Sequence, residues 1–358
     1  MAPVEVPKVQ RALVCDKPQK DYELKLVNDY PVPQPKYGEV LVKLSSTGVC
    51  HSDLSLLQDH WAGALSMQCK VAGHEGVGRI VAHGEGVDKE KFPIGLRCGV
   101  PLMRHTCQSC EDCWLPGQEC YCENGLFSAV QLDGSFMEYV PVETSYFCPV
   151  PEEIPDKYVG PILCGGVTVY KSIKNAGLDC GDWLVITGAG GGLGSMAIQY
   201  ANAKGIRVIG VDTGSEKEAT CVQAGIEKFI DFRKVKDVTA EVFKITGGKG
   251  AHGSMVLVPS EAAYNQAVTY LRKHGSLMCV GLPDVTATIK ISPVVAVFRD
   301  IKVIASLVGT RQDIAEALDL AARGKFHPYV EEYELKDAKK VLDTMASGQL
   351  NGRAVLKF

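Results

Sequence analysis

The chain has 358 residues, of which 46% are hydrophobic and 22% are charged, and its formal net charge is −4. This composition is ordinary for a globular protein, and the charge excludes a field built for nucleic acid or an anionic membrane. The length exceeds what one compact core usually holds and predicts two domains. No apolar run reaches the roughly 20 residues that span a bilayer, and the N-terminus lacks the apolar core of a signal peptide. We therefore expect a cytoplasmic protein that binds neither membranes nor nucleic acid.

The first 150 residues predict an irregular, β-rich domain. Val40, Val42 and Leu44 recur at every second position, which is the alternation of a half-buried strand. Glycines follow every few residues up to Gly134, and this pattern is typical of short strands joined by long loops.

A different pattern begins near residue 165, where short apolar segments alternate with helical stretches. The expected strands are 182–187, 206–211, 229–230, 254–258, 276–280 and 302–306, and the expected helices are 193–204, 216–224, 237–246 and 260–272. Alternation of this kind predicts a parallel, doubly wound sheet. Two further helices, at 311–323 and 337–347, and a strand at 353–358 close the chain.

A glycine-rich turn follows the first strand of this second half. Gly188, Gly191 and Gly194 form a G-x-x-G-x-x-G pattern, in which backbone amides can approach a pyrophosphate closely. The helix after the turn presents its positive N-terminus to the phosphates. The pattern alone is a weak signal, because glycine-rich turns are common for purely local reasons.

Asp212 ends the next expected strand, where an acid accepts hydrogen bonds from the adenosine ribose. The same carboxylate repels the 2′-phosphate of NADP, and residues 213–215 supply no arginine, so we expect NAD. The alternative is an ordinary solvated loop acid. Lys217 either reaches the ribose hydroxyls or is a surface lysine.

Four cysteines gather in the first half of the chain. Cys107, Cys110 and Cys113 share a two-residue spacing, and either Cys120 or Cys122 supplies a fourth sulfur. Four thiolates leave no open coordination position, which indicates a structural zinc site. Disulfides are the alternative and are disfavoured in a reducing compartment.

A second candidate set is spread along the chain and consists of Cys50, His74 and Cys164. Two thiolates and one imidazole leave the fourth position of a zinc ion open for water or substrate. Zinc then acts as a Lewis acid that lowers the pKa of a bound alcohol. Taken alone, each of these residues is more simply interpreted as a buried side chain of the core. Only the presence of all three together with the dinucleotide pattern favours a catalytic zinc.

These residues together resemble the medium-chain zinc alcohol dehydrogenases. Residues 73–78 (GHEGVG) with Gly84 resemble the zinc signature of that family. Five further segments resemble the yeast-type fungal group of that family: GVCHSD at 48–53, PILCGGVTVYK at 161–171, GAHG at 250–253, SEAA at 260–263 and EALDLAARG at 316–324. The resemblance runs from about residue 10 to the end of the chain.

The resemblance implies an α/β protein with a GroES-like β-rich catalytic domain, residues 1–165 and 304–358. A Rossmann domain with a doubly wound parallel sheet, residues 166–303, is inserted and binds NAD. The resemblance also implies two zinc ions per subunit, and it selects Cys122 as the fourth structural ligand, because residues 117–119 match the segment just upstream.

For the catalytic zinc, the resemblance implies Cys50, His74 and Cys164 as ligands, with Glu75 behind the metal. Asp53 hydrogen-bonds the imidazole of His74, and this contact fixes its orientation. Ser52 matches the hydroxyl that takes the proton of the alcohol.

For the cofactor, the resemblance places His51 and Arg353 at the pyrophosphate and Thr168 near the nicotinamide. The full expected cofactor set is His51, Thr168, Gly188, Gly191, Gly192, Leu193, Gly194, Asp212, Lys217, Val280 and Arg353. The yeast-type group also forms tetramers, so we expect a homotetramer.

The expected reaction is the reversible oxidation of a small primary alcohol to an aldehyde, with hydride transfer to NAD. Other zinc enzymes of the superfamily, of the cinnamyl or polyol type, fit the same ligands. A zinc-free quinone reductase or a non-catalytic Rossmann protein would not need Cys50, His74 and Cys164 together.

Three positions depart from the yeast-type pattern. Ser55 stands where the family commonly has the histidine that ends the proton relay. In the substrate pocket Trp61 matches a family tryptophan, whereas Leu102 and Leu282 replace a second tryptophan and a methionine. The pocket should therefore be wider than in an ethanol specialist and accept longer or branched alcohols.

Overall fold

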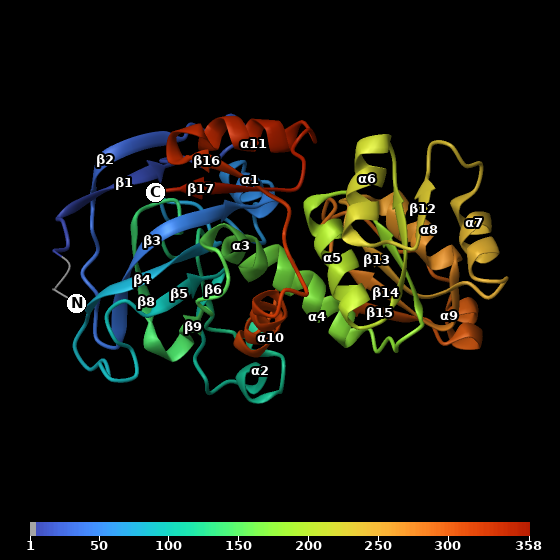
Figure 1. Ribbon diagram of the computed structural model, residues 1–358, viewed down its shortest axis with the longest axis horizontal. Helices are drawn as coiled ribbons and strands as arrows, with labels where there is room; N and C mark the ends of the chain where they lie inside the picture. The colour runs from blue at the N-terminus through green and yellow to red at the C-terminus, as the bar shows by residue number, and fades with distance from the viewer. Residues whose placement is uncertain (1–4) are drawn as a thin grey trace. The chain divides into compact units, whose positions relative to one another are not determined.

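The computed structural model describes residues 5–358, which form two compact units (Figure 1). Unit 1 comprises the described part of Met1–Cys164 together with Gly309–Ala322 and Val330–Phe358. Unit 2 comprises Gly165–Val308 and Arg323–Tyr329. The boundary expected after residue 303 falls inside strand β15 (Lys302–Ala305), which pairs with the sheet of unit 2, so unit 2 extends to Val308.

Unit 1 is built on a seven-stranded sheet in which only β16 and β17 pair in parallel. The order is β16 (Val330–Glu334), β17 (Arg353–Lys357), β3 (Glu39–Val49), β4 (Gly76–His83), β5 (Arg97–Val100) and β9 (Cys148–Pro149), with β8 (Tyr139–Glu143) also paired to β3. Two small sheets pair β1 (Val9–Val14) with β2 (Lys25–Pro31), and β6 (Met103–His105) with β7 (Leu126–Phe127).

Strand β3 is buried more deeply than its alternation predicts. Val40, Val42 and Leu44 enter the main core, as expected, but Leu41 is also buried and packs with Val32 and Tyr139 in a second cluster. The predicted half-buried alternation otherwise holds up to Ser45, because Lys43 and Ser45 on the opposite face are exposed, whereas the residues from Ser46 to Val49 are buried on both faces.

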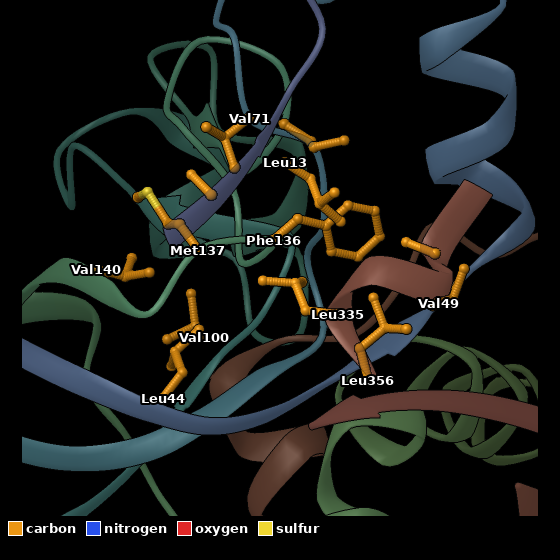
Figure 2. Packing of buried hydrophobic residues seen from close by; sticks show 14 of the residues in the cluster. Leu13, Leu44, Val49, Val71, Val100, Phe136, Met137, Val140, Leu335 and Leu356 are labelled. Carbon is orange, nitrogen blue, oxygen red and sulfur yellow. The ribbon is translucent and has the colours of Figure 1, made fainter. Parts of the chain in front are cut away.

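The C-terminal segment completes the core of unit 1. Figure 2 shows Leu335 and Leu356 among the side chains around Phe136, together with Val49 from the end of β3. Residues from both ends of the chain thus bury one another, which holds β17 beside β3.

Unit 2 contains a six-stranded sheet in which every neighbouring pair is parallel. The order is β12 (Lys228–Asp231), β11 (Arg207–Asp212), β10 (Trp183–Thr187), β13 (Ala251–Val256), β14 (Leu271–Cys279) and β15. The chain starts at β10, moves outward to β12, and returns to the other side of β10 at β13. This order confirms the predicted doubly wound fold and puts its switch point between β10 and β13.

The helices of unit 2 are α4 (Val167–Asn175), α5 (Gly192–Ala203), α6 (Ser215–Ala224), α7 (Val238–Ile245), α8 (Glu261–Thr269) and α9 (Pro293–Arg299). The helix expected over 260–272 ends at Thr269, because β14 begins at Leu271. The sequence pattern does not predict helix α9, because its residues 293–298 are all apolar and show no amphipathic period.

Unit 1 holds α1 (His51–Leu57), α2 (Glu111–Trp114), α3 (Asp156–Pro161), α10 (Arg311–Ala322) and α11 (Ala338–Ala346). Across residues 5–358, every helix is too short or too polar to cross a membrane.

An ion pair ties α10 to the cysteine-rich loop within unit 1. Arg311 donates from its backbone N–H (2.7 Å) and its guanidinium (2.8 Å from Nη2) to the carboxylate of Glu119. The guanidinium also lies over the ring of Tyr146. Burial raises the pKa of Glu119, but the bonds from Arg311 outweigh it and hold that pKa below its ordinary value.

We expect Glu119→Gln to destabilise the protein by about 1 kcal/mol, after allowance for solvent screening, and to lower Tm by roughly 1–3 °C. Because the folded-state pKa is depressed, the contribution is complete above the ordinary pKa of glutamate and disappears as the pH falls through the folded-state value. Calorimetry of the unmodified protein and of Glu119→Gln across this pH range measures the gap in Tm between them. Glu152→Gln, in the exposed Arg79 pair, is the control and should change Tm little; a gap that stays constant with pH would contradict the assignment.

Candidate metal and cofactor sites

Four buried side chains of unit 1 converge although three different segments carry them. Cys50 precedes α1, His74 and Glu75 precede β4, and Cys164 lies in the π-helical turn Ile162–Gly166 that follows α3. One donor atom from each lies within 4.8 Å of the others. The cluster therefore joins the residues that the sequence could connect only through a family resemblance.

The spacing of the donors fits a zinc ion. The sulfurs of Cys50 and Cys164 are 3.8 Å apart, and Nε2 of His74 is 3.1 Å from the sulfur of Cys164. Two thiolates bound tetrahedrally at a Zn–S distance of about 2.3 Å would lie roughly 3.8 Å from each other. The residues present can thus hold the metal without a large rearrangement.

Asp53 orients two of the donors at once. Its Oδ1 lies 2.7 Å from Nδ1 of His74 and accepts from the backbone N–H of Gly73, while Oδ2 accepts from the N–H of Cys50. A proton held on Nδ1 leaves the lone pair of Nε2 free for a metal.

The cluster buries the charge of the Cys50 thiolate in a dry site, whereas hydrogen bonding to Cys50 and burial raise the pKa of Cys164 well above its ordinary value. Hydrogen bonding from Cys164 lowers the pKa of Cys50 well below its ordinary value, against the effect of burial. Burial alone would lower the pKa of His74, but Asp53 and Cys50 raise it well above its ordinary value. A bound cation would neutralise this charge, which is why the donor set suits a metal ion.

Glu75 forms a buried ion pair with Arg353, which donates from Nη2 to Oε1 of the carboxylate. Oε2 of Glu75 has no hydrogen-bond partner although the residue is fully buried. Burial raises the pKa of Glu75 to about 7, with Arg353 opposing the shift. The sequence analysis placed Arg353 only at the cofactor and missed this pair, whose members lie 278 residues apart.

The other expected residues near the metal occupy different environments. Ser52 is half-buried in the first turn of α1, beside the exposed His51, and Ser55 is buried. Trp61 packs against the core of unit 1, and Leu102 is half-buried in the same unit. Leu282 belongs to unit 2 and is 64% exposed.

The cysteine-rich loop forms a second candidate metal site. The sulfurs of Cys107, Cys110, Cys113 and Cys122 lie within 4.8 Å of one another, with 3.6 Å from Cys122 to Cys107. Cys120 is buried outside this group. Backbone N–H groups of Cys107 and Cys110 donate to the sulfurs of Cys122 and Cys107, which stabilises thiolates. Across residues 5–358 no two cysteines form a disulfide.

The glycine-rich turn of unit 2 joins β10 to α5, and Gly191 is the residue before the first turn of the helix. A Cβ on Gly194 would lie 2.4 Å from the carbonyl oxygen of Gly188, and Gly188 itself has a φ of +81°. Gly190, which the sequence analysis did not single out, would place a Cβ 2.4 Å from that of Lys217. The glycines therefore hold the turn close to α5 and α6, and the N–H groups of Gly188, Gly190 and Gly191 are bonded within the turn and to β11.

Asp212 ends β11 and is almost fully buried. Its Oδ2 accepts from the N–H of Gly190 (2.9 Å), and its Oδ1 lies 3.4 Å from Nζ of Lys217. Val280 follows β14 at the same edge of the sheet, and Thr168 lies in α4. The glycine turn, Gly192, Leu193, Asp212 and Val280 thus gather at the carboxyl edge, where doubly wound sheets bind ligands.

Comparison with known families gives two matches. The model described as "Alcohol dehydrogenase GroES-like domain" matches residues 36–152, and the model described as "Zinc-binding dehydrogenase" matches residues 192–323. Alcohol dehydrogenase 1 of Emericella nidulans is 39% identical over 356 residues, and alcohol dehydrogenase 1 of Neurospora crassa is 37% identical over 357 residues. Each alignment covers 99% of both chains.

Solved structures are similar over the same length. Acetophenone reductase from Geotrichum candidum, in complex with NAD, has a TM-score of 0.86 at 27% identity and covers 99% of both chains. The alcohol dehydrogenase from the archaeon Aeropyrum pernix has a TM-score of 0.85 at 28% identity, over 97% of this chain and 100% of that one.

We expect Cys122→Ser to remove one metal ion per chain, because a hydroxyl replaces one of four thiolates that close the site. Cys120→Ser is the matched control and should keep the metal content of the unmodified protein. Elemental analysis of the purified variants measures zinc per chain. Equal zinc content in the two variants would contradict the assignment of Cys122 as a ligand.

Proposed function

The chain belongs to the zinc-dependent, medium-chain alcohol dehydrogenases of the fungal type, and from that premise we propose that it oxidises primary alcohols, longer or branched ones included, reversibly to aldehydes with NAD. The observation that carries the proposal is the buried donor set of Cys50, His74 and Cys164, whose spacing suits zinc. Its second support is Asp212 at the carboxyl edge of the parallel sheet.

The proposed roles near the metal follow from the contacts. Cys50, His74 and Cys164 hold the catalytic zinc, with Glu75 beside them, and Asp53 keeps His74 in the metal-binding tautomer. When bound, zinc polarises the alcohol oxygen as a Lewis acid and NAD accepts the hydride. The hydroxyl of Ser52 would relay the alcohol proton, releasing its own proton as it accepts that of the alcohol.

Proton exit differs from the relay of the family. Ser55 is buried, and a serine hydroxyl is too weak a base to hold a proton near neutral pH. We infer that the proton relayed by Ser52 leaves to water, because Ser55 supplies no base to receive it.

For the cofactor, we propose that the N–H groups of Gly192, Leu193 and Gly194, at the N-terminus of α5, hold the pyrophosphate, with His51 and Arg353 as further contacts of the cofactor. Asp212 and Lys217 hold the adenosine ribose, and Thr168 and Val280 contact the nicotinamide. The structural zinc occupies the site of Cys107, Cys110, Cys113 and Cys122.

We propose a homotetramer in the cytoplasm. In α9, Val297 and Phe298 are each 79% exposed, and the neighbouring β15 ends the sheet with Val303 about half exposed. An apolar edge strand of this kind is normally covered, and a second copy of the chain would cover it. The free thiols suit a reducing compartment.

We expect kcat/KM with NAD to rise from ethanol toward longer or branched primary alcohols, because Leu102 leaves more room than the tryptophan of the yeast-type group. Leu102→Trp should lower activity on long alcohols at least tenfold more than activity on ethanol. Steady-state rates over a chain-length series measure both effects. A series that peaks at ethanol and falls steeply would contradict the wide pocket.

We expect Asp212→Asn to relax the preference for NAD over NADP by roughly tenfold or more, since it removes the negative charge that repels the 2′-phosphate. The ratio of kcat/KM for the two cofactors is the measurement. Asp231→Asn, which changes an acid at the end of the neighbouring strand β12, is the control. An unchanged ratio in the Asp212 variant would remove the proposed role.

A further inference from the structure

Gly48 lies in β3, just before the metal-binding Cys50, and faces the side chain of Glu75. A Cβ built on Gly48 would lie 1.9 Å from Oε2 of Glu75 and 3.0 Å from its Cβ and Cδ. The backbone of Gly48 is in a strand and has no positive φ, so a turn does not explain the glycine. The glycine is needed for space, and the space is filled by one carboxylate oxygen.

That carboxylate is confined on two sides. Oε1 is held by Nη2 of Arg353, and Oε2 rests against Gly48 without a hydrogen-bond partner. The residue is fully buried, and one of its carboxylate oxygens lies within 4.8 Å of the donors of Cys50, His74 and Cys164. A Cβ on Gly48 would therefore displace Oε2 while Arg353 holds Oε1, and the donors of Cys50, His74 and Cys164 lie within reach of the displaced carboxylate.

We propose that Gly48 is a positioning residue that keeps Glu75 from occupying the open coordination position of the catalytic metal. This inference rests on the proposed catalytic zinc. A methyl group at position 48 drives Oε2 toward the metal, where the carboxylate competes with an exogenous ligand for the position that substrate must use.

Gly160 of α3 provides a matched control at the same place. A Cβ on Gly160 would meet the backbone of the two residues, at 2.5 Å from the carbonyl oxygen of Glu75 and 2.7 Å from the nitrogen of Gly48. Gly160→Ala therefore perturbs the packing of α3 on β3 without touching the carboxylate.

The test uses the full chain with cobalt in place of zinc, in the unmodified protein, Gly48→Ala, Gly160→Ala, Glu75→Asp and the double variant Gly48→Ala/Glu75→Asp. The readouts are the visible spectrum of cobalt, its affinity for imidazole as an added ligand, and the rate at which a chelator removes it. We expect Gly48→Ala to change the cobalt spectrum, to weaken imidazole binding at least tenfold and to slow the removal of cobalt by the chelator. Gly160→Ala should lower Tm and weaken imidazole binding much less than Gly48→Ala does, because its methyl group meets backbone atoms and not the carboxylate.

The double variant decides whether the effect runs through the carboxylate. Because aspartate is shorter by one methylene, it should restore imidazole affinity to within about threefold of that of Glu75→Asp alone. If Gly48→Ala does not fold, recovery of folding and of cobalt binding in the double variant is the expected result. The proposal is overturned if Gly48→Ala leaves imidazole affinity unchanged. It is also overturned if the double variant restores neither the cobalt spectrum nor the folding. An unmodified protein that binds one cobalt per chain would instead refute the catalytic zinc site.

Discussion

The burial of several ionisable side chains in one dry pocket is the constraint on which the structure of unit 1 depends. Two cysteines and a glutamate lie there with His74, far from water, and their charge must be balanced within the protein or by a metal. Arg353 balances part of it at Glu75, and Asp53 fixes the imidazole so that its free nitrogen points into the cluster.

Assembly of the pocket depends on strands that are distant in the sequence. Strand β3 leads to Cys50, β4 starts after Glu75, and β17 brings Arg353 beside β3 through antiparallel pairing. The same pairing buries Leu356 against Phe136, so the hydrophobic core that stabilises unit 1 also delivers the arginine (Figure 2). Stability and metal binding are therefore linked through the C-terminal strand.

Unit 2 relies on backbone rather than on buried charge. The order in which the chain adds strands to its parallel sheet reverses between β10 and β13, and the glycine turn brings the N-terminus of α5 to that point. Asp212 accepts a hydrogen bond from Gly190 and so stabilises the turn. The same carboxylate is the group to which we assign the preference for NAD. The two units thus contribute different chemistry: charged donors in one and directed N–H groups in the other.

The sequence by itself determined features whose parts are close along the chain. The spacing of Cys107, Cys110 and Cys113 and the glycine turn before α5 were readable because neighbouring residues build each of them. Tertiary structure alone decided the pair of Arg353 with Glu75, the contact of Gly48 with that carboxylate, and the burial of both faces of β3. Periodicity reports which face of an element is apolar, whereas these features depend on which distant element packs against it.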